Sequence, residues 1–342
     1  MQLVAFGMAS LAVMGNDALQ TLGPFLASQP RGSQRLWTGL FLAGLLCGVL
    51  LLSWMAGAGD PAWGRLEHFP LPNPWRLTDL LPLLALLALT RFGLPVSTSF
   101  LVLTAVAPMH LGGMLRKSLA GYGLAFLGAA LVYGTLAPWL EGARPQGEER
   151  PSPSLPWPAL QWLATAVLWS QWLVQDLANI YVYLPRRLSL AELIVSLIVL
   201  CGAVALIVIL GGGPIQGRLR SKWQSADPRS TTVISLLYGL LLLAFLGGNR
   251  LPMSTSWLFL GLLAGREVGL GLRGVGRPTP AILQDLTLDL LRAGGGTGDE
   301  LGGGPAGGCR SRMSASIFRI RVRVLCHTSR RKRWLSSPLW LS

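Results

Sequence analysis

The sequence predicts an all-α polytopic membrane protein made of two inverted-topology repeats, each with three full spans and a re-entrant helical hairpin. Its 342 residues are 51% hydrophobic and only 13% charged, with a mean hydropathy of +0.49, which is too apolar for an ordinary soluble protein. Several apolar runs reach the length of about 20 residues that a bilayer requires. A two-part polar pattern also occurs twice at nearly equal spacing, which indicates an internal duplication.

The first part of this pattern places a carboxylate beside carboxamides within an apolar run, at residues 3–27 and again at 160–184. Its polar residues are Asn16, Asp17, Gln20 and Thr21 in the first copy and Gln175, Asp176 and Asn179 in the second. An ionisable side chain at bilayer depth costs at least ~2.5–3.5 kcal/mol. The two aspartates therefore predict a polar cavity or an ion path.

The second part of the pattern is a proline followed by hydroxyl side chains. The residues are Pro95 with Ser97, Thr98 and Ser99 in the first copy, and Pro252 with Ser254, Thr255 and Ser256 in the second. Asn16 and Pro95 are 79 positions apart, and Gln175 and Pro252 are 77 positions apart. The near-equal separations predict that both copies have the same local architecture.

The first repeat is expected at residues 1–140. Its opening apolar run lacks an A-x-A-like cleavage site, so we expect a retained span and not a removed signal. Two shorter runs predict a hairpin whose tip, 93–99, lies within the membrane near Asp17. Gly44 and Gly48 either allow close helix packing through their GxxxG spacing or occur by chance in a glycine-rich helix. The expected elements are full spans at 3–27, 37–57 and 118–140, and hairpin arms at 77–92 and 96–109.

The second repeat is expected at residues 159–291, after a proline-rich linker at 141–158. Its elements are spans at 160–184 and 190–210, a basic loop at 218–229, hairpin arms at 231–247 and 252–264, and a last helix at 281–291 that is either complete or cut short. The Gly- and Arg-rich tail, 292–342, is either a disordered basic segment near anionic lipid or an aberrant C-terminus. We favour the second alternative as a hypothesis, because the composition changes abruptly within a helix.

Three full crossings are an odd number, so the second repeat must be inverted relative to the first. Inverted repeats are typical of secondary transporters, which bind their substrates near the bilayer midplane. The Lys/Arg distribution over the loops, 11 inside against 6 outside, favours an outside N-terminus. We expect an integral multi-pass protein of the cell (plasma or inner) membrane, in contact with lipid and either monomeric or homodimeric.

The net charge of +14 does not indicate a nucleic-acid partner, because the last 51 residues supply +8 of it and the rest lies in short loops. The four cysteines and three histidines have no spacing typical of disulfide frameworks or metal ligands. We therefore expect no cofactor apart from a coupling ion.

The predicted site combines two opposite chemistries. Hairpin hydroxyls, backbone N–H groups and the positive ends of half-helices suit an oxyanion. The carboxylates of Asp17 and Asp176 suit Na⁺ or H⁺. Bound cations would offset the carboxylates, which otherwise repel the anion, and this coupling predicts an anion moved together with cations.

At these residues the chain resembles the inorganic phosphate transporter family, the PiT-type cation–phosphate symporters. The family signature is Gly-x-Asn-Asp-x-x-Asn, followed by Pro-x-Ser-Thr-Thr-His. The first copy resembles it in Gly15-Asn16-Asp17-x-x-Gln20, where the glycine directly precedes the asparagine, with Pro95-x-Ser97-Thr98-Ser99; the second copy does so in Gln175-Asp176-x-x-Asn179 with Pro252-x-Ser254-Thr255-Ser256. The resemblance implies that the hairpin Ser/Thr groups and the motif carboxamides hold inorganic phosphate or a similar oxyanion. It also implies Na⁺ or H⁺ near Asp17 and Asp176. The departures are Gln20, Gln175, Leu173 in place of a glycine, and Phe100 and Trp257 in place of the final histidines.

Three alternatives remain open at this point. The aspartates can instead be structural, hydrogen-bonded between helices, and the hairpin hydroxyls can bond to their own helix backbone. The protein can also be a transport-inactive relative of the family that acts as a membrane sensor or partner protein. An intramembrane aspartyl protease, with two carboxylates sharing a proton, is disfavoured because its Tyr-Asp and Gly-x-Gly-Asp motifs are absent around Asp17 and Asp176. We expect a transporter and not an enzyme.

Overall fold

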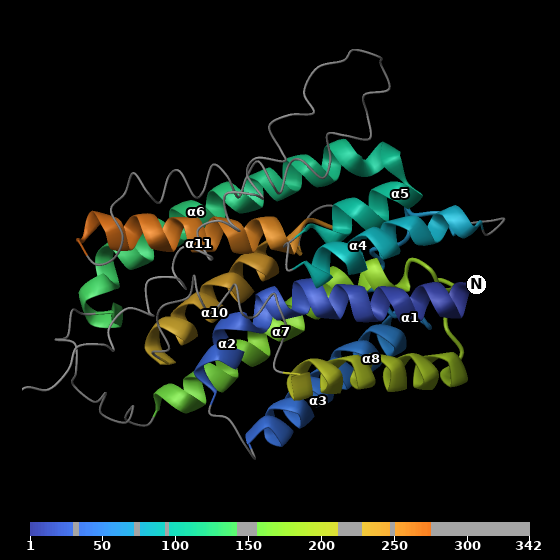
Figure 1. The fold of residues 1–342 in the computed structure, drawn as a ribbon, viewed down its shortest axis with the longest axis horizontal. Helices are drawn as coiled ribbons and strands as arrows, with labels where there is room; N and C mark the ends of the chain where they lie inside the picture. The colour runs from blue at the N-terminus through green and yellow to red at the C-terminus, as the bar shows by residue number, and fades with distance from the viewer. Residues whose placement is uncertain are drawn as a thin grey trace, which may run out of the picture. The chain divides into compact units, whose positions relative to one another are not determined.

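A computed structural model describes residues 1–29, 34–71, 76–92, 96–141, 156–210, 228–246 and 250–274 (Figure 1). All of them belong to one compact unit, Met1–Gly298. Every regular element in the described ranges is helical, which confirms the all-α prediction. The linker, the last predicted helix and the tail lie almost entirely outside the described residues.

The helices of the first half follow the predicted order. They are α1 (Gln2–Val13), a π-helical turn (Met14–Ala18), α2 (Leu19–Ser28), α3 (Gln34–Ala56), a 3₁₀ turn (Leu77–Leu80) with α4 (Leu81–Arg91), a π-helical turn (Ser99–Leu103) with α5 (Thr104–Val106), a 3₁₀ turn (Pro108–His110) and α6 (Leu111–Glu141). The second half contains α7 (Trp157–Tyr181), α8 (Leu190–Leu210), α10 (Pro228–Ala244) and α11 (Thr255–Leu272).

The second arm of the first hairpin differs from its prediction as one helix at 96–109. The helix breaks at Ala107, where φ is −141° and ψ is 78°, because a following proline disfavours the helical conformation of the residue before it. The chain then enters α6 directly through the 3₁₀ turn Pro108–His110. As a result α6 begins at Leu111, seven residues before the expected span 118–140.

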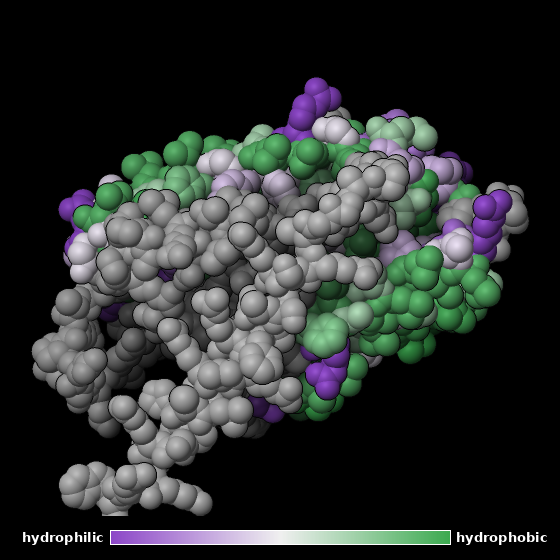
Figure 2. All heavy atoms as spheres, turned by 45° about the horizontal axis from the view of Figure 1, so that its top comes forward, coloured by the Kyte–Doolittle hydropathy of each residue, from purple (hydrophilic) through white to green (hydrophobic). Residues whose placement is uncertain are grey.

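Among the described residues, three helices are long and apolar enough to cross a membrane. They cover Arg35–Ala56, Pro108–Leu140 and Leu190–Leu210. Large apolar side chains on these helices point outward: Leu127, Leu131, Ile198 and Ile209 are 65–68% exposed. In Figure 2 such apolar side chains, coloured green, gather on the described surface. Exposed apolar area of this kind is typical of contact with lipid, and the protein is a helical membrane protein.

The helices pack in pairs, two of which join the two halves. Helix α11 runs along α6 and α3 along α8, while α10 runs along α7 within the second half (Figure 1). Two kinds of contact occur twice: α1 packs on α4 as α7 packs on α10 within each half, and α3 packs on α7 as α8 packs on α1 between the halves.

Glycines bring α11 directly against α6. A Cβ added to Gly261 or Gly265 would collide with the carbonyl oxygens of Tyr122 or Phe126, and one at Gly269 would lie 2.8 Å from the carbonyl oxygen of Ala130. Small residues at four-residue spacing allow such close backbone contact. Gly44 and Gly48 are different, because no described atom lies within 4 Å of an added Cβ; their spacing serves no close contact in the described part of the chain.

Candidate functional site

The polar residues of the repeated pattern all lie inside the protein. None of the thirteen predicted site residues is more than 9% exposed. Buried polar groups are usually hydrogen-bonded, because an unpaired one loses its bonds to water. The partners of these side chains therefore show how the two halves are joined.

Asp17 is held by both hairpins. Its Oδ2 accepts a hydrogen bond from Thr98 Oγ1 of the first hairpin, and its Oδ1 accepts one from Ser256 Oγ of the second hairpin at 3.1 Å. Asn16 Nδ2 also donates to Oδ1 at 2.7 Å. The Val96 carbonyl accepts from Asn16 Nδ2 at 2.7 Å and from Ser256 Oγ at 3.2 Å, which closes the network.

Asp176 occupies the corresponding position in the second half. Its Oδ2 accepts from Thr255 Oγ1 at 2.6 Å, and its Oδ1 accepts from Asn179 Nδ2 at 2.8 Å. The same Asn179 amide is 3.1 Å from both Thr98 Oγ1 and Ser99 Oγ of the first hairpin. The second acidic motif is thus bonded to the hairpin of the other half, as the first motif is.

The three hydroxyl residues of each hairpin divide into the same three roles. The middle residue, Thr98 or Thr255, donates to the aspartate of its own half. The last residue crosses to the other half: Ser256 donates to Asp17, and Ser99 accepts from the second motif and donates to the Met253 carbonyl at 3.2 Å.

The first hydroxyl residue of each hairpin caps a helix. Ser97 Oγ accepts from Phe100 N at 3.3 Å, and Ser254 Oγ accepts from Trp257 N at 3.2 Å. Both bonds follow the N-cap pattern, in which the side chain satisfies a backbone N–H of the first turn. The hydroxyls of these two residues therefore bond to the backbone of their own helix, which was one of the alternatives left open by the sequence. Their role in ligand binding stays a prediction.

Several acceptor oxygens near the aspartates have no donor. Gln20 donates from Nε2 to Asn16 Oδ1 at 3.3 Å, and Gln175 donates from Nε2 to the Leu242 carbonyl at 3.3 Å. No described residue donates to Gln20 Oε1, Gln175 Oε1 or Asn179 Oδ1, while the Thr21 hydroxyl interacts with that of Tyr238. Such oxygens, together with carboxylates, are ligands that hard cations prefer.

The two aspartates sit in different backbone settings. Asp17 lies in the π-helical turn Met14–Ala18, whereas Asp176 lies within the uninterrupted helix α7. π-Helical turns occur often at functional sites, because they widen the helix locally. The difference follows the sequence, in which Gly15 directly precedes Asn16 whereas Val174 directly precedes Gln175.

Arg65 belongs to this region, although it was assigned only as a loop charge from the sequence. It lies in the loop 57–71, is 3% exposed, and interacts electrostatically with Asp176. Burial lowers the pKa of Arg65 to about 10, well below its ordinary value, while the charge of Asp176 acts in the opposite direction. Arg65 is therefore a buried cation at neutral pH. Sequence reasoning had no signal for it, because a loop arginine is ordinarily solvated.

No protein-family model, curated protein or solved structure matches this chain. Among the described residues, His, Cys, Asp and Glu side chains also form no group of three that could hold a metal ion. Fold and site together define a helical membrane protein with an acidic, hydroxyl-rich cluster buried between its two halves. Its function has to be argued from that cluster.

Proposed function

We propose that this protein is a secondary transporter that moves inorganic phosphate or a similar oxyanion across the membrane with Na⁺ or H⁺ as the coupling ion. The observation that carries the proposal is the convergence of both acidic motifs and both hairpins on one buried cluster. In it Ser256 of the second half bonds to Asp17, and Asn179 bonds to Thr98 of the first half. A site made by two halves is what alternating access requires, because movement of one half against the other opens it to either side.

The cluster favours cation binding, because its two buried carboxylates form no ion pair among the described residues. Asp17 and Asp176 are at most 2% exposed, and neither forms an ion pair within the described part of the chain. Isolated buried carboxylates are costly unless a counter-charge or a proton neutralises them. Na⁺ or H⁺ supplies that charge, and the unpaired oxygens of Gln20, Gln175 and Asn179 offer further ligands.

The inverted-repeat architecture is part of the proposal. It is supported by two contacts that each occur twice. The α1–α4 contact of the first half corresponds to α7–α10 of the second, and the contact α3–α7 between the halves corresponds to α8–α1. The matching roles of the hairpin hydroxyls support it further. A two-fold relation between the halves would produce these pairs of equivalent contacts from one duplicated sequence.

The test is uptake of radiolabelled phosphate into proteoliposomes under imposed Na⁺ and H⁺ gradients. We expect uptake to follow one gradient and to be lost in Asp17→Asn and in Asp176→Asn. Asp79→Asn is the matched control, because Asp79 lies outside the cluster. Its Oδ2 accepts a hydrogen bond from Arg76 N at the start of the turn Leu77–Leu80, and an asparagine side chain keeps an accepting oxygen. Uptake that persists in both cluster variants, or that fails in folded wild-type protein, would overturn the proposal; binding without flux would favour the sensor alternative.

A further inference from the structure

The loop that carries Arg65 has an unusual backbone. Ala58, Gly59, Trp63 and Gly64 all have positive φ, at 49°, 101°, 56° and 70°. Alanine and tryptophan rarely adopt this conformation, which persists only where surrounding contacts hold it and which is common near functional sites. The contacts of this loop are therefore informative.

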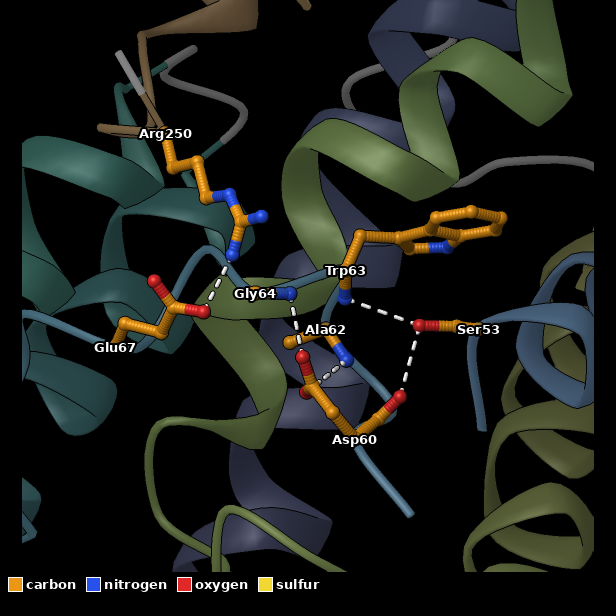
Figure 3. A network of polar contacts seen from close by, with 7 residues as sticks. All are labelled: Ser53, Asp60, Ala62, Trp63, Gly64, Glu67 and Arg250. Carbon is orange, nitrogen blue, oxygen red and sulfur yellow. Dashed lines mark hydrogen bonds and ion pairs between the residues drawn. The ribbon is translucent and has the colours of Figure 1, made fainter. Parts of the chain in front are cut away.

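Two side chains hold the loop in this conformation (Figure 3). Asp60 accepts hydrogen bonds from the backbone N–H groups of Ala62, at 2.8 Å, and Gly64. Ser53, in α3, donates to the Asp60 carbonyl at 2.9 Å and accepts from Trp63 N at 3.0 Å. The backbone is thus fixed immediately before Arg65.

The loop is also tied to the second half of the protein. Leu188 N donates to the Gly59 carbonyl at 2.9 Å, and Arg186 Nη2 donates to the Phe69 carbonyl at 2.9 Å. Arg250, shortly before the second hairpin motif, forms an ion pair with Glu67 (Figure 3). These contacts bracket Arg65 on both sides along the chain.

The side chain of Arg65 is buried, and one of its donors lacks an acceptor in the described part of the chain. It is 3% exposed, and no described residue accepts a hydrogen bond from its Nη1. Its positive charge interacts with the charge of Asp176, and it repels the charge of Lys117, whose Nζ donates to the Leu251 carbonyl at 2.9 Å. A buried guanidinium carries a large desolvation cost unless its donors are paired. The loop keeps Arg65 buried despite this cost.

We propose that Arg65 binds the transported oxyanion, with its guanidinium donating hydrogen bonds to the oxyanion's oxygens beside Asp176. The inference rests on the proposed function and adds the anion-binding group that the acidic cluster lacks. A guanidinium presents a planar fork of donors that matches two oxygens of a phosphate or similar oxyanion. Arginine therefore suits this role better than the hydroxyls, which already donate to the carboxylates and the Met253 and Val96 carbonyls.

This assignment also explains how cation and anion binding are coupled. While Asp176 is ionised, it attracts Arg65 and repels an incoming anion. A cation or proton at Asp176 removes both effects and leaves the guanidinium to the oxyanion. In Asp176→Asn the same state is permanent, so anion binding should persist and no longer depend on the cation.

The experiment measures equilibrium binding of radiolabelled phosphate to the full chain in lipid nanodiscs, with Na⁺ or choline at two pH values. We expect Arg65→Gln to bind phosphate roughly ten- to hundredfold more weakly, because it loses the charged hydrogen-bond donors of the guanidinium. Arg65→Lys should bind with intermediate affinity. Arg116→Gln is the matched control, since this arginine is exposed on α6. Sulfate and arsenate serve as competitors that define the class of oxyanion.

A double variant separates anion binding from a merely structural role. If Arg65 only neutralises Asp176, Arg65→Gln combined with Asp176→Asn should restore both stability and phosphate binding. If Arg65 binds the anion, the double variant should regain stability, measured by thermal unfolding, but not binding.

Three results would overturn the inference: equal phosphate binding by folded Arg65→Gln, binding restored in the double variant, or no binding of phosphate, sulfate or arsenate by the wild type. The outcome is separable from that of the proposed function. Arg65-dependent binding without flux would remove the transport proposal and keep the inference, whereas coupled flux that survives Arg65→Gln would do the opposite.

Discussion

Ser256 donates a hydrogen bond to Asp17 across 3.1 Å, although 239 positions separate the two residues in the chain. The second hairpin thereby completes the environment of the first acidic motif. Thr98 of the first hairpin bonds to the other oxygen of the same carboxylate. Neither half can therefore form this site alone, and substitutions in one half should change ligand binding at the motif of the other.

Ser256→Ala and Ser254→Ala should separate binding from capping. Ser256→Ala removes a donor from the Asp17 carboxylate, and we expect cation-dependent uptake to fall about tenfold or more, in line with the loss of one charge-assisted hydrogen bond. Ser254→Ala removes the N-cap of α11 and should lower stability by about 1 kcal/mol with little effect on the apparent cation affinity. Thermal unfolding and uptake, measured on both variants, decide the matter; the reverse pattern would contradict the assigned roles.

Thr98→Val should destabilise the protein more than Thr255→Val. Thr98 donates to Asp17 and accepts from Asn179, so valine removes two hydrogen bonds between buried groups, whereas Thr255→Val removes the one to Asp176. We expect a loss of roughly 1.5–3 kcal/mol for the first variant, because hydrogen bonds to charged groups are among the stronger ones. Thr98→Ser retains the hydroxyl and is the control. A stability of Thr98→Val equal to that of wild type in denaturant titrations would contradict the network.

Gly265→Ala should disrupt the packing of α11 on α6. An added Cβ would collide with the Phe126 carbonyl oxygen, which belongs to backbone and cannot move aside easily. Overpacking of this kind costs roughly 1–3 kcal/mol or more. Gly48→Ala is the matched control, since no described atom lies near its added Cβ and alanine favours the helix by about 1 kcal/mol over glycine. A lower melting temperature is expected for the first variant only.

Cys47 and Cys201 provide a direct test of the contact between α3 and α8. Their sulfur atoms are 3.6 Å apart, so a small side-chain rotation brings them to the ~2.05 Å of a disulfide. Mild oxidation should link them without loss of fold. With a protease site placed in the linker at 141–158, the two denatured fragments of the oxidised protein should stay joined until the disulfide is reduced. Cys47→Ser is the control, because its fragments should separate even after oxidation. Separation of the oxidised wild-type fragments would contradict the contact.

The sequence predicted the helices well where apolar length is the main signal. The span expected at 190–210 coincides with α8, and that expected at 37–57 differs from α3 by three residues at its start and one at its end. The break at Ala107 was missed because the apolar run continues through Pro108, and composition alone does not register the local steric effect of a proline. The inverted relation of the halves stays a prediction.

What the sequence determined by itself is which residues can be the site. Asp17, Asp176 and the two hydroxyl triplets stand out because polar groups in apolar runs are costly and therefore specific. Only the tertiary structure decided how they are used: which hydroxyl caps a helix, which crosses between halves, and that Arg65 is buried. Hydrogen bonds and burial depend on distances between segments far apart in the chain, and no local pattern encodes whether a loop arginine faces water or an aspartate in the other half.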